Sequence, residues 1–324
     1  MPSGAVAKRL LLLAGLGMVV LMLVGLVFGA IGTAIRDEDG KPYVEQPRIH
    51  LPPQPVFPAS ARAEFLGLDH EGEAEAEAGH DINPLGMGEF AITNTLISSW
   101  FVTVILILFF LLGARKRSLI PGRFQGMIEG LFEGILGFSS GVLGPEMARK
   151  AFPIVATIFF FVLFNAWLSL LPFYHFFGFK DDGGELLVEF FRSAGTDLNM
   201  ALALALVSFA FVEYWGLRTH GLGYFKKFFA WGNLLRGRPS GLIDAFVGLL
   251  EGVSELVRVV SFTFRLFGNM TAGEILVVMI TFLVPFVAVQ FVFGLELLVG
   301  LIQAVIFASL TVVFLSVAVR HEEH

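Results

Sequence analysis

A stripe of polar and ionised residues inside an apolar segment near the C-terminus is the feature most suited to chemistry. Its members step by three or four residues, so they share one face of a helix that turns 100° per residue. They are Glu251, Glu255, Arg258, Arg265 and Asn269, and the apolar Phe262 lies on the same face between Arg258 and Arg265. A guanidinium stays protonated and cannot relay a proton, but it can hold a nearby carboxylate in its ionised form. The stripe therefore predicts control over the protonation of an acid.

Arg265 and Glu274 are expected to face different surroundings. Nine residues separate them, which is about 180° of rotation and about 13.5 Å along a helix. A mid-membrane arginine costs about 2.5–3.5 kcal/mol, and no acid lies three or four residues from Arg265. Its partner should therefore lie on another helix or another subunit. For Glu251, Glu255 and Arg258, pairing with one another or reaching an interface is an equally good interpretation.

The last apolar segment has a second, thinner polar line. Glu296 and Gln303 are seven residues apart and share a helix face. Gly300, Ala304 and Ala308 recur every four residues, a row of small side chains that lets another helix approach closely. A packing seam with two incidental polar groups is the alternative interpretation.

The composition indicates what positions these residues. The 324-residue chain is 56% hydrophobic and 15% charged, with a mean hydropathy of +0.77, whereas soluble domains are about 25% charged. This predicts a polytopic membrane protein. The absence of cysteine excludes disulfides and thiol chemistry, and no basic footprint for nucleic acid is present. No phosphate loop, nucleophile elbow or zinc motif occurs, so we expect no catalytic nucleotide site, cofactor or metal on this chain.

We expect an all-α fold with about six membrane helices, because a span needs about 20 apolar residues. The first would be retained as an anchor rather than cleaved. The expected spans lie within residues 10–35, 90–114, 151–179 (closed near Pro172), 196–217 and 242–319, where two helices part near Pro285. Residues 123–140 are expected to form an amphipathic helix along the cytoplasmic surface.

Three regions follow from this division: an anchor at 1–35, a Pro- and Glu-rich external loop at 36–89, and a channel domain at 90–324. Proline density and like charges predict an extended or disordered loop. His50, His70 and His80 could bind a metal there, but no ligand spacing recurs, so a solvated acidic loop is preferred. Most Lys and Arg residues fall on one side, which predicts that both termini are cytoplasmic if the first helix is retained.

Residues 265–274, RLFGNMTAGE, resemble the signature of subunit a of F-type ATP synthases. The segments 250–254 (LEGVS), 196–199 (TDLN), 301–304 (LIQA) and 152–172 are similar to further family segments. The resemblance runs from Ile92 to the C-terminus. It implies a stationary proton-translocating subunit whose C-terminal two-helix hairpin faces the c-ring and whose offset half-channels couple proton flow to rotation and ATP synthesis.

The resemblance also implies a role for each matching residue. Arg265 corresponds to the essential arginine that faces the ring carboxylates. Five residues correspond to family positions in the outer half-channel or around the arginine: Glu274, Glu296, Gln303, Asn199 and Asp197. Positions near the cytoplasmic exit correspond to Glu251, Ser261 and Asn269. Glu296 departs from the many bacterial relatives that have histidine there, so two carboxylates replace a carboxylate and an imidazole.

The implied partners are the c-ring, the b subunits of the peripheral stalk and the rest of the synthase. The implied location is a bacterial plasma membrane. One alternative is a secondary transporter or permease in which Arg265 binds an anion. The chain has no evident inverted repeat of the kind that many transporters contain. Another alternative, a purely structural subunit of a respiratory complex, leaves Arg265 unexplained.

Overall fold

The computed structural model describes most of the chain. The described residues are 4–36, 53–58, 60–62, 91–114, 122–171, 174, 177–180, 186–221, 223–224 and 240–320. They form two compact units. One combines Met1–Leu51 with Asn269–Val299, and the other combines Pro52–Gly268 with Gly300–His324.

Helices make up nearly all of the described structure. They are α1 (Gly4–Phe28), α2 (Ala30–Arg36), α4 (Asn94–Ala114), α5 (Arg123–Leu143), α6 (Pro145–Leu168), α7 (Leu198–His220), α9 (Ser240–Leu283) and α10 (Val287–Val319), with a 3-10 helix, η2, at Ala194–Thr196. Within the described ranges, α4, α6, α7, α9 and α10 are long and apolar enough to cross a membrane, and α1 adds a shorter apolar stretch. The predicted all-α membrane fold with about six membrane helices is confirmed.

The third expected span differs from the prediction at both ends. It begins at Pro145 rather than residue 151, because Gly144 ends α5 in the left-handed region (φ 78°) and proline suits the first turn of α6. It ends at Leu168, before Pro172, where the Ser169 hydroxyl donates to the Ala166 carbonyl at 2.9 Å. The sequence around residue 178 is therefore not helical.

Two short antiparallel strand pairs were not predicted. The first joins β1 (Pro55–Phe57) to β2 (Ile92–Thr93), and the second joins β3 (Gly178–Lys180) to β4 (Leu186–Glu189). β1 lies inside the Pro- and Glu-rich segment, where the sequence indicated only an extended or disordered chain. Most of residues 36–89, including His50, His70 and His80, lie outside the described residues.

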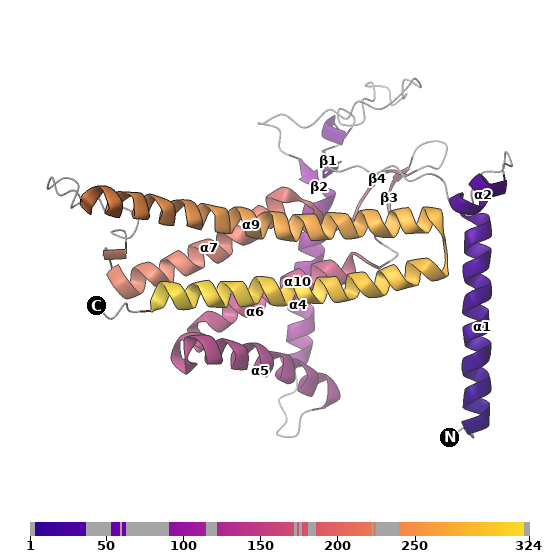
Figure 1. Cartoon of the computed structure of the whole chain (residues 1–324), viewed down its shortest axis with the longest axis horizontal. Coiled ribbons are helices and arrows are strands. Elements are labelled where there is room, and N and C mark those ends of the chain that lie inside the picture. Colours follow the sequence, from indigo (N-terminus) through magenta and orange to yellow (C-terminus); the bar gives the residue numbers. More distant parts are fainter. Residues whose placement is uncertain are drawn as a thin grey trace. The chain divides into compact units, whose positions relative to one another are not determined.

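The last two helices form the predicted antiparallel hairpin, which turns at Val284–Phe286. α9 has 44 residues and α10 has 33, so they are about 66 Å and about 50 Å long. A hydrocarbon core of about 30 Å can contain such helices only when they are steeply tilted. In the second unit, the parts of α9 and α10 that belong to it run steeply across the direction of α4 (Figure 1).

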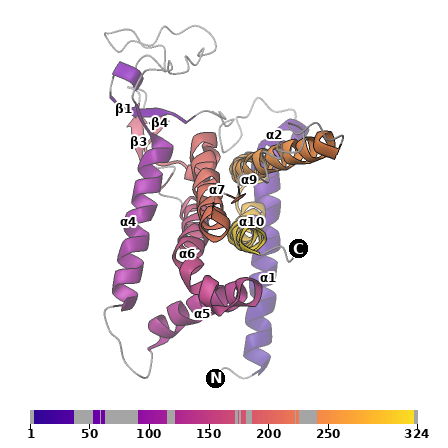
Figure 2. The ribbon, with the colours of Figure 1, turned by 90° about the vertical axis from the view of Figure 1, so that its left-hand side faces the viewer.

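Phenylalanine rings fill the contact between α4, α5 and α6 in the second unit. Phe110 contacts Phe132 of α5 and Phe160 of α6, with ring centroids 5.4 and 4.9 Å apart. Figure 2 shows α5 lying across the end of α4 rather than beside it. The predicted amphipathic helix at 123–140 is therefore present as α5, and its direction is compatible with a position along a membrane surface.

The row of small residues on α10 is a packing seam. Ala304 and Ala308 are buried. A side chain at Gly300 would come within 2.6 Å of the Ala166 methyl group on α6. The missing side chain therefore lets the two backbones approach closely.

In the first unit, α1 packs against the turn of the hairpin. A side chain at Gly25 would collide with the carbonyl of Pro285, and one at Gly29 would collide with that of Leu283. Phe286 in this turn has a φ of 75°, an uncommon conformation for a residue with a side chain.

Candidate functional site

Arg265 lies half-buried on α9, and its charge is not neutralised by the described part of the chain. Its Nη2 donates to the Ser261 hydroxyl at 3.4 Å, and its guanidinium lies 5.9 Å from the centroid of the Phe262 ring. Within the described ranges it forms no ion pair. The sequence has no acid one helical turn from Arg265 and predicts a partner on another helix or another subunit; among the described residues no acid pairs with it, so the predicted partner stays a prediction.

The surface beside Arg265 is an exposed apolar helix face. Val257, Val260 and Phe264 are each more than half exposed, and Ser261 is also exposed. Lipid or an apolar partner must cover such a face in a membrane. Arg265 lies at its margin, so its guanidinium can reach a group on whatever covers it.

The N-terminal half of the stripe is different, because Glu255 and Arg258 pair locally. An Nη1 atom of Arg258 lies 2.5 Å from a carboxylate oxygen of Glu255. The same guanidinium lies 3.8 Å from the centroid of the Phe314 ring on α10. For these two residues the local-pairing interpretation is confirmed. Glu251, one turn earlier, is half-buried.

Asp197 is a helix cap as well as a candidate channel residue. One carboxylate oxygen accepts from the backbone N–H of Asn199 at 2.9 Å, and the other accepts from the Thr95 hydroxyl at 2.8 Å. Asp197 is 8% exposed. Both oxygens therefore position α7 against α4, while the Asn199 side chain is exposed.

The two candidate acids of the first unit come close to one small residue. Gly273 precedes Glu274, and a side chain at Gly273 would collide with the carboxylate of Glu296 on α10. Glu274 and Glu296 are both half-buried, and Asn269 is exposed. The glycine thus makes room for Glu296 beside the helix segment that carries Glu274.

Gln303 belongs to the second unit and is buried, with 1% of its surface exposed. Ala304 is buried beside it in the sequence. The polar line predicted for α10 therefore points into the protein at Gln303, which fits a role within the helix bundle better than one at its surface.

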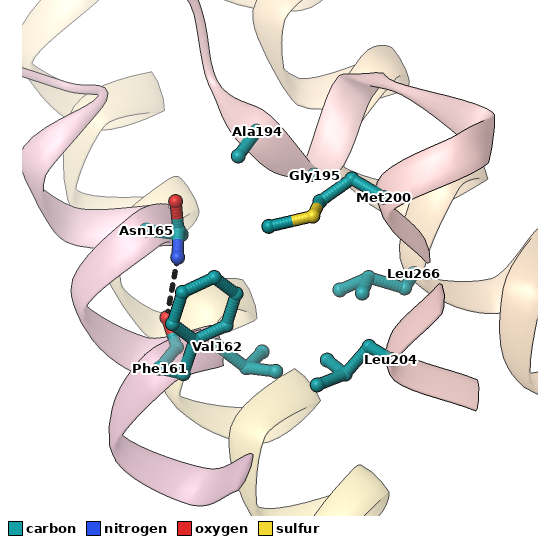
Figure 3. Close-up of a pocket in the computed structure, with 8 residues that line it drawn as sticks. All are labelled: Phe161, Val162, Asn165, Ala194, Gly195, Met200, Leu204 and Leu266. Carbon is teal, nitrogen blue, oxygen red and sulfur yellow. Dashed lines mark hydrogen bonds between the residues drawn. The ribbon is translucent and has the colours of Figure 1, made fainter. Parts of the chain in front are cut away.

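A small pocket of about 10 Å³ lies between α6, η2, α7 and α9, with Asn165 and Leu266 in its lining (Figure 3). This volume is at the lower limit for one water molecule. The Asn165 amide donates to the Phe161 carbonyl at 2.8 Å, and its Oδ1 has no hydrogen-bond partner among the described residues. That oxygen is available to a single water.

Sequence reasoning missed one group of ionisable residues, at the C-terminal end of α7. Neither Glu213, which lies within the expected span 196–217, nor Tyr224 was among the predicted site residues. The structure brings them together, because the Tyr224 hydroxyl donates to the Glu213 carboxylate. A carboxylate inside a membrane span was the available signal, since such residues are functional by default.

Comparison with known proteins agrees with this architecture. The pattern of the ATP synthase A chain family matches residues 96–316. The chain is 34% identical over 232 residues to ATP synthase subunit a of Gloeobacter violaceus, an overlap of 71% of this chain and 86% of that protein. It is 33% identical over 229 residues to ATP synthase subunit a of Sulfurihydrogenibium sp. (71% and 98%). The Helicobacter acinonychis protein of that name is 30% identical over 237 residues (72% and 94%). This integral membrane chain therefore belongs to the ATP synthase A chain family.

Proposed function

We propose that this chain is the stationary subunit that conducts protons between two offset half-channels and the c-ring, and so couples proton flow to rotation. The observation that carries the proposal is Arg265. Its guanidinium is half-buried, forms no ion pair within the described residues, and adjoins the exposed apolar face of α9. A permanently charged group placed in this way needs an anion from outside the chain.

The c-ring supplies that anion in the proposed mechanism. A ring carboxylate that approaches Arg265 is held ionised, and it releases its proton to the cytoplasmic half-channel. After it passes the arginine, it accepts a proton from the outer half-channel and becomes neutral, so it can enter lipid. Each charge moved across the membrane gains about 2.3 kcal/mol per 100 mV. Arg265 also separates the two half-channels.

The candidate residues divide between the two proposed paths. Glu274, Glu296 and Gln303 serve the outer path and the surroundings of Arg265. Asn199 lines the outer opening, and Asp197 shapes it through its bonds to Thr95 and α7. The cytoplasmic path contains Glu251, Ser261 and Asn269.

The proposed partners and location follow from the same mechanism. Besides the c-ring, we propose that the chain contacts the b subunits of the peripheral stalk within the synthase complex. We also propose a bacterial plasma membrane as its location, and the distribution of Lys and Arg supports both termini in the cytoplasm if the first helix is retained. The comparisons give no support to a secondary transporter.

The substitution Arg265→Ala tests the proposal. We expect it to abolish proton-coupled ATP synthesis in membrane vesicles while the complex still assembles, because the ring acid loses the only charge that holds it ionised. Arg218→Ala is the matched control, since Arg218 is exposed at the end of α7 and donates to the Tyr214 hydroxyl at 2.8 Å. Normal synthesis by Arg265→Ala would contradict the proposal.

A further inference from the structure

The C-terminal end of α7 forms a seat for a buried tyrosine. Gly221 ends the helix with a φ of 61° and turns the chain back, which returns Tyr224 to the helix. A side chain at Gly216 would come within 2.7 Å of the Tyr224 ring. Gly216 lies three residues after Glu213, so both face the same side of α7. Tyr224 is 7% exposed and donates its hydroxyl to the Glu213 carboxylate.

Charges from α9 also act on this seat. The electrostatic fields of Glu255 and Arg258 both reach the Tyr224 hydroxyl, and they act in opposite directions. Burial, the nearby Glu213 charge and the bond to that carboxylate all raise the pKa of Tyr224. Tyr224 therefore stays a neutral hydrogen-bond donor at physiological pH.

The helices around the seat are joined to one another. The Ser208 and Thr311 hydroxyls share a hydrogen bond of 2.7 Å between α7 and α10. The ring of His220, on α7, lies parallel to that of Tyr224, with centroids 6.2 Å apart. Among the described residues, the charged groups that act on Tyr224 are thus Glu213 on α7 and Glu255 and Arg258 on α9, and the His220 ring lies beside it.

The cation nearest to this group on α9 is already engaged by another acid. Arg258 forms a close ion pair with Glu255, so its charge is directed mainly at that carboxylate. Glu213 is a carboxylate inside an apolar helix, a position where such residues are usually functional, and the Tyr224 hydroxyl donates to it.

We propose that Glu213 is a proton-binding residue of the cytoplasmic half-channel, and that Tyr224 holds it in place. This inference rests on the proposed function. Arg258 precedes Arg265 by seven residues, or about 10.5 Å along α9, so the group lies on the side that the charge distribution assigns to the cytoplasm. In the proposed step, the O–H bond of a ring carboxyl group breaks, and the proton crosses through water to form an O–H bond on Glu213. Glu213 then releases the proton to bulk water.

The test measures ATP-driven proton pumping by the assembled complex in membrane vesicles, across cytoplasmic-side pH from 6 to 9. For Glu213→Gln we expect the pumping rate to fall by roughly tenfold, the lower range for loss of one proton-transfer group, and its pH profile to flatten. Glu213→Asp should keep a sloping profile, because the carboxylate remains. Glu146→Gln is the control, since Glu146 is an exposed acid at the start of α6.

Tyr224→Phe is the second variant, and it keeps the carboxylate. We expect its pH profile to shift toward higher pH, because the ionised Glu213 loses a donor. A uniform loss of rate with an unchanged profile in both variants would indicate a purely structural role and overturn the inference. An unchanged rate in Glu213→Gln would also overturn it. If Arg265→Ala remains inactive in the same vesicles, the proposed function survives either outcome.

Discussion

Each end of α7 carries an acid, buried at Asp197 and half-buried at Glu213, and the two acids have different hydrogen-bond partners. Asp197, at the N-terminal end, accepts a backbone N–H with one oxygen and a hydroxyl with the other. Glu213 lies two turns before the C-terminal end, and it accepts from a phenol near an ion pair.

Two buried tyrosines, Tyr174 and Tyr224, show a similar contrast in their hydrogen-bond partners. The Tyr174 hydroxyl bonds to Ser98, a neutral group, and burial raises the pKa of Tyr174 to about 12. The same Ser98 hydroxyl accepts from the backbone N–H of Arg192 at 2.9 Å. The Tyr224 hydroxyl instead bonds to the Glu213 carboxylate. Tyr174 is thus held by a neutral partner, and Tyr224 by the carboxylate that we propose as a proton-binding group.

Of the substitutions at the two ends of α7, Asp197→Ala should lower stability the most. The variant loses the cap of α7 and leaves the Thr95 hydroxyl buried without its acceptor, which costs about 1–3 kcal/mol. Thermal release of this subunit from the purified complex measures the loss. Asp197→Asn, which still caps a helix, should lose less. If Asp197→Ala instead had normal stability and a changed pH profile of pumping, Asp197 would belong to the proton path. The contrast between the two ends of α7 would then be wrong.

Gly216→Ala should have an intermediate effect, at the other end. The added methyl group displaces the Tyr224 ring, so the Glu213 carboxylate loses one hydrogen bond, worth about 0.5–1.5 kcal/mol. We expect proton pumping to fall roughly twofold to tenfold, since 1.4 kcal/mol corresponds to a factor of ten. Gly134→Ala is the control, because a side chain there meets no atom within 4 Å. Equal pumping by both variants would show that Tyr224 does not act on Glu213.

Tyr174→Phe should have the smallest effect, a loss of about 1 kcal/mol in stability with an unchanged pH profile of pumping. The pKa of Tyr174 is higher in the folded protein than the ordinary 10, so its stabilising contribution is complete below pH 10 and is lost as the pH rises toward 12. Thermal melts at pH 9 and pH 11 should therefore show the wild-type advantage shrinking. A wild-type stability advantage that grows with pH would contradict the raised pKa of Tyr174.

Helix content and the position of Arg265 could be predicted from the sequence, because they depend on local patterns. The four- and three-residue steps placed Arg265 on the stripe, and Pro285 marked the hairpin turn. The strand β1 could not be predicted, because its pairing with Ile92–Thr93 depends on residues far away in the chain.

The partners of the candidate acids were also out of reach of the sequence. Nothing near Asp197 indicates its bond to Thr95, 102 residues earlier. Tyr224 follows an apolar helix by a few residues and resembles an ordinary interfacial aromatic residue. Its approach to Glu213 depends on the turn at Gly221 and the space at Gly216, which only the folded backbone reveals.

The close approach of Gly300 to Ala166 has a mechanical consequence. Two helix backbones in near contact leave little free volume between them, so α10 cannot recede toward α6 under a sideways load. In the proposed complex, where the c-ring pushes against this subunit, that stiffness would pass the load on to the peripheral stalk instead of absorbing it as local deformation. The missing side chain at Gly300 would thus help the subunit to resist displacement.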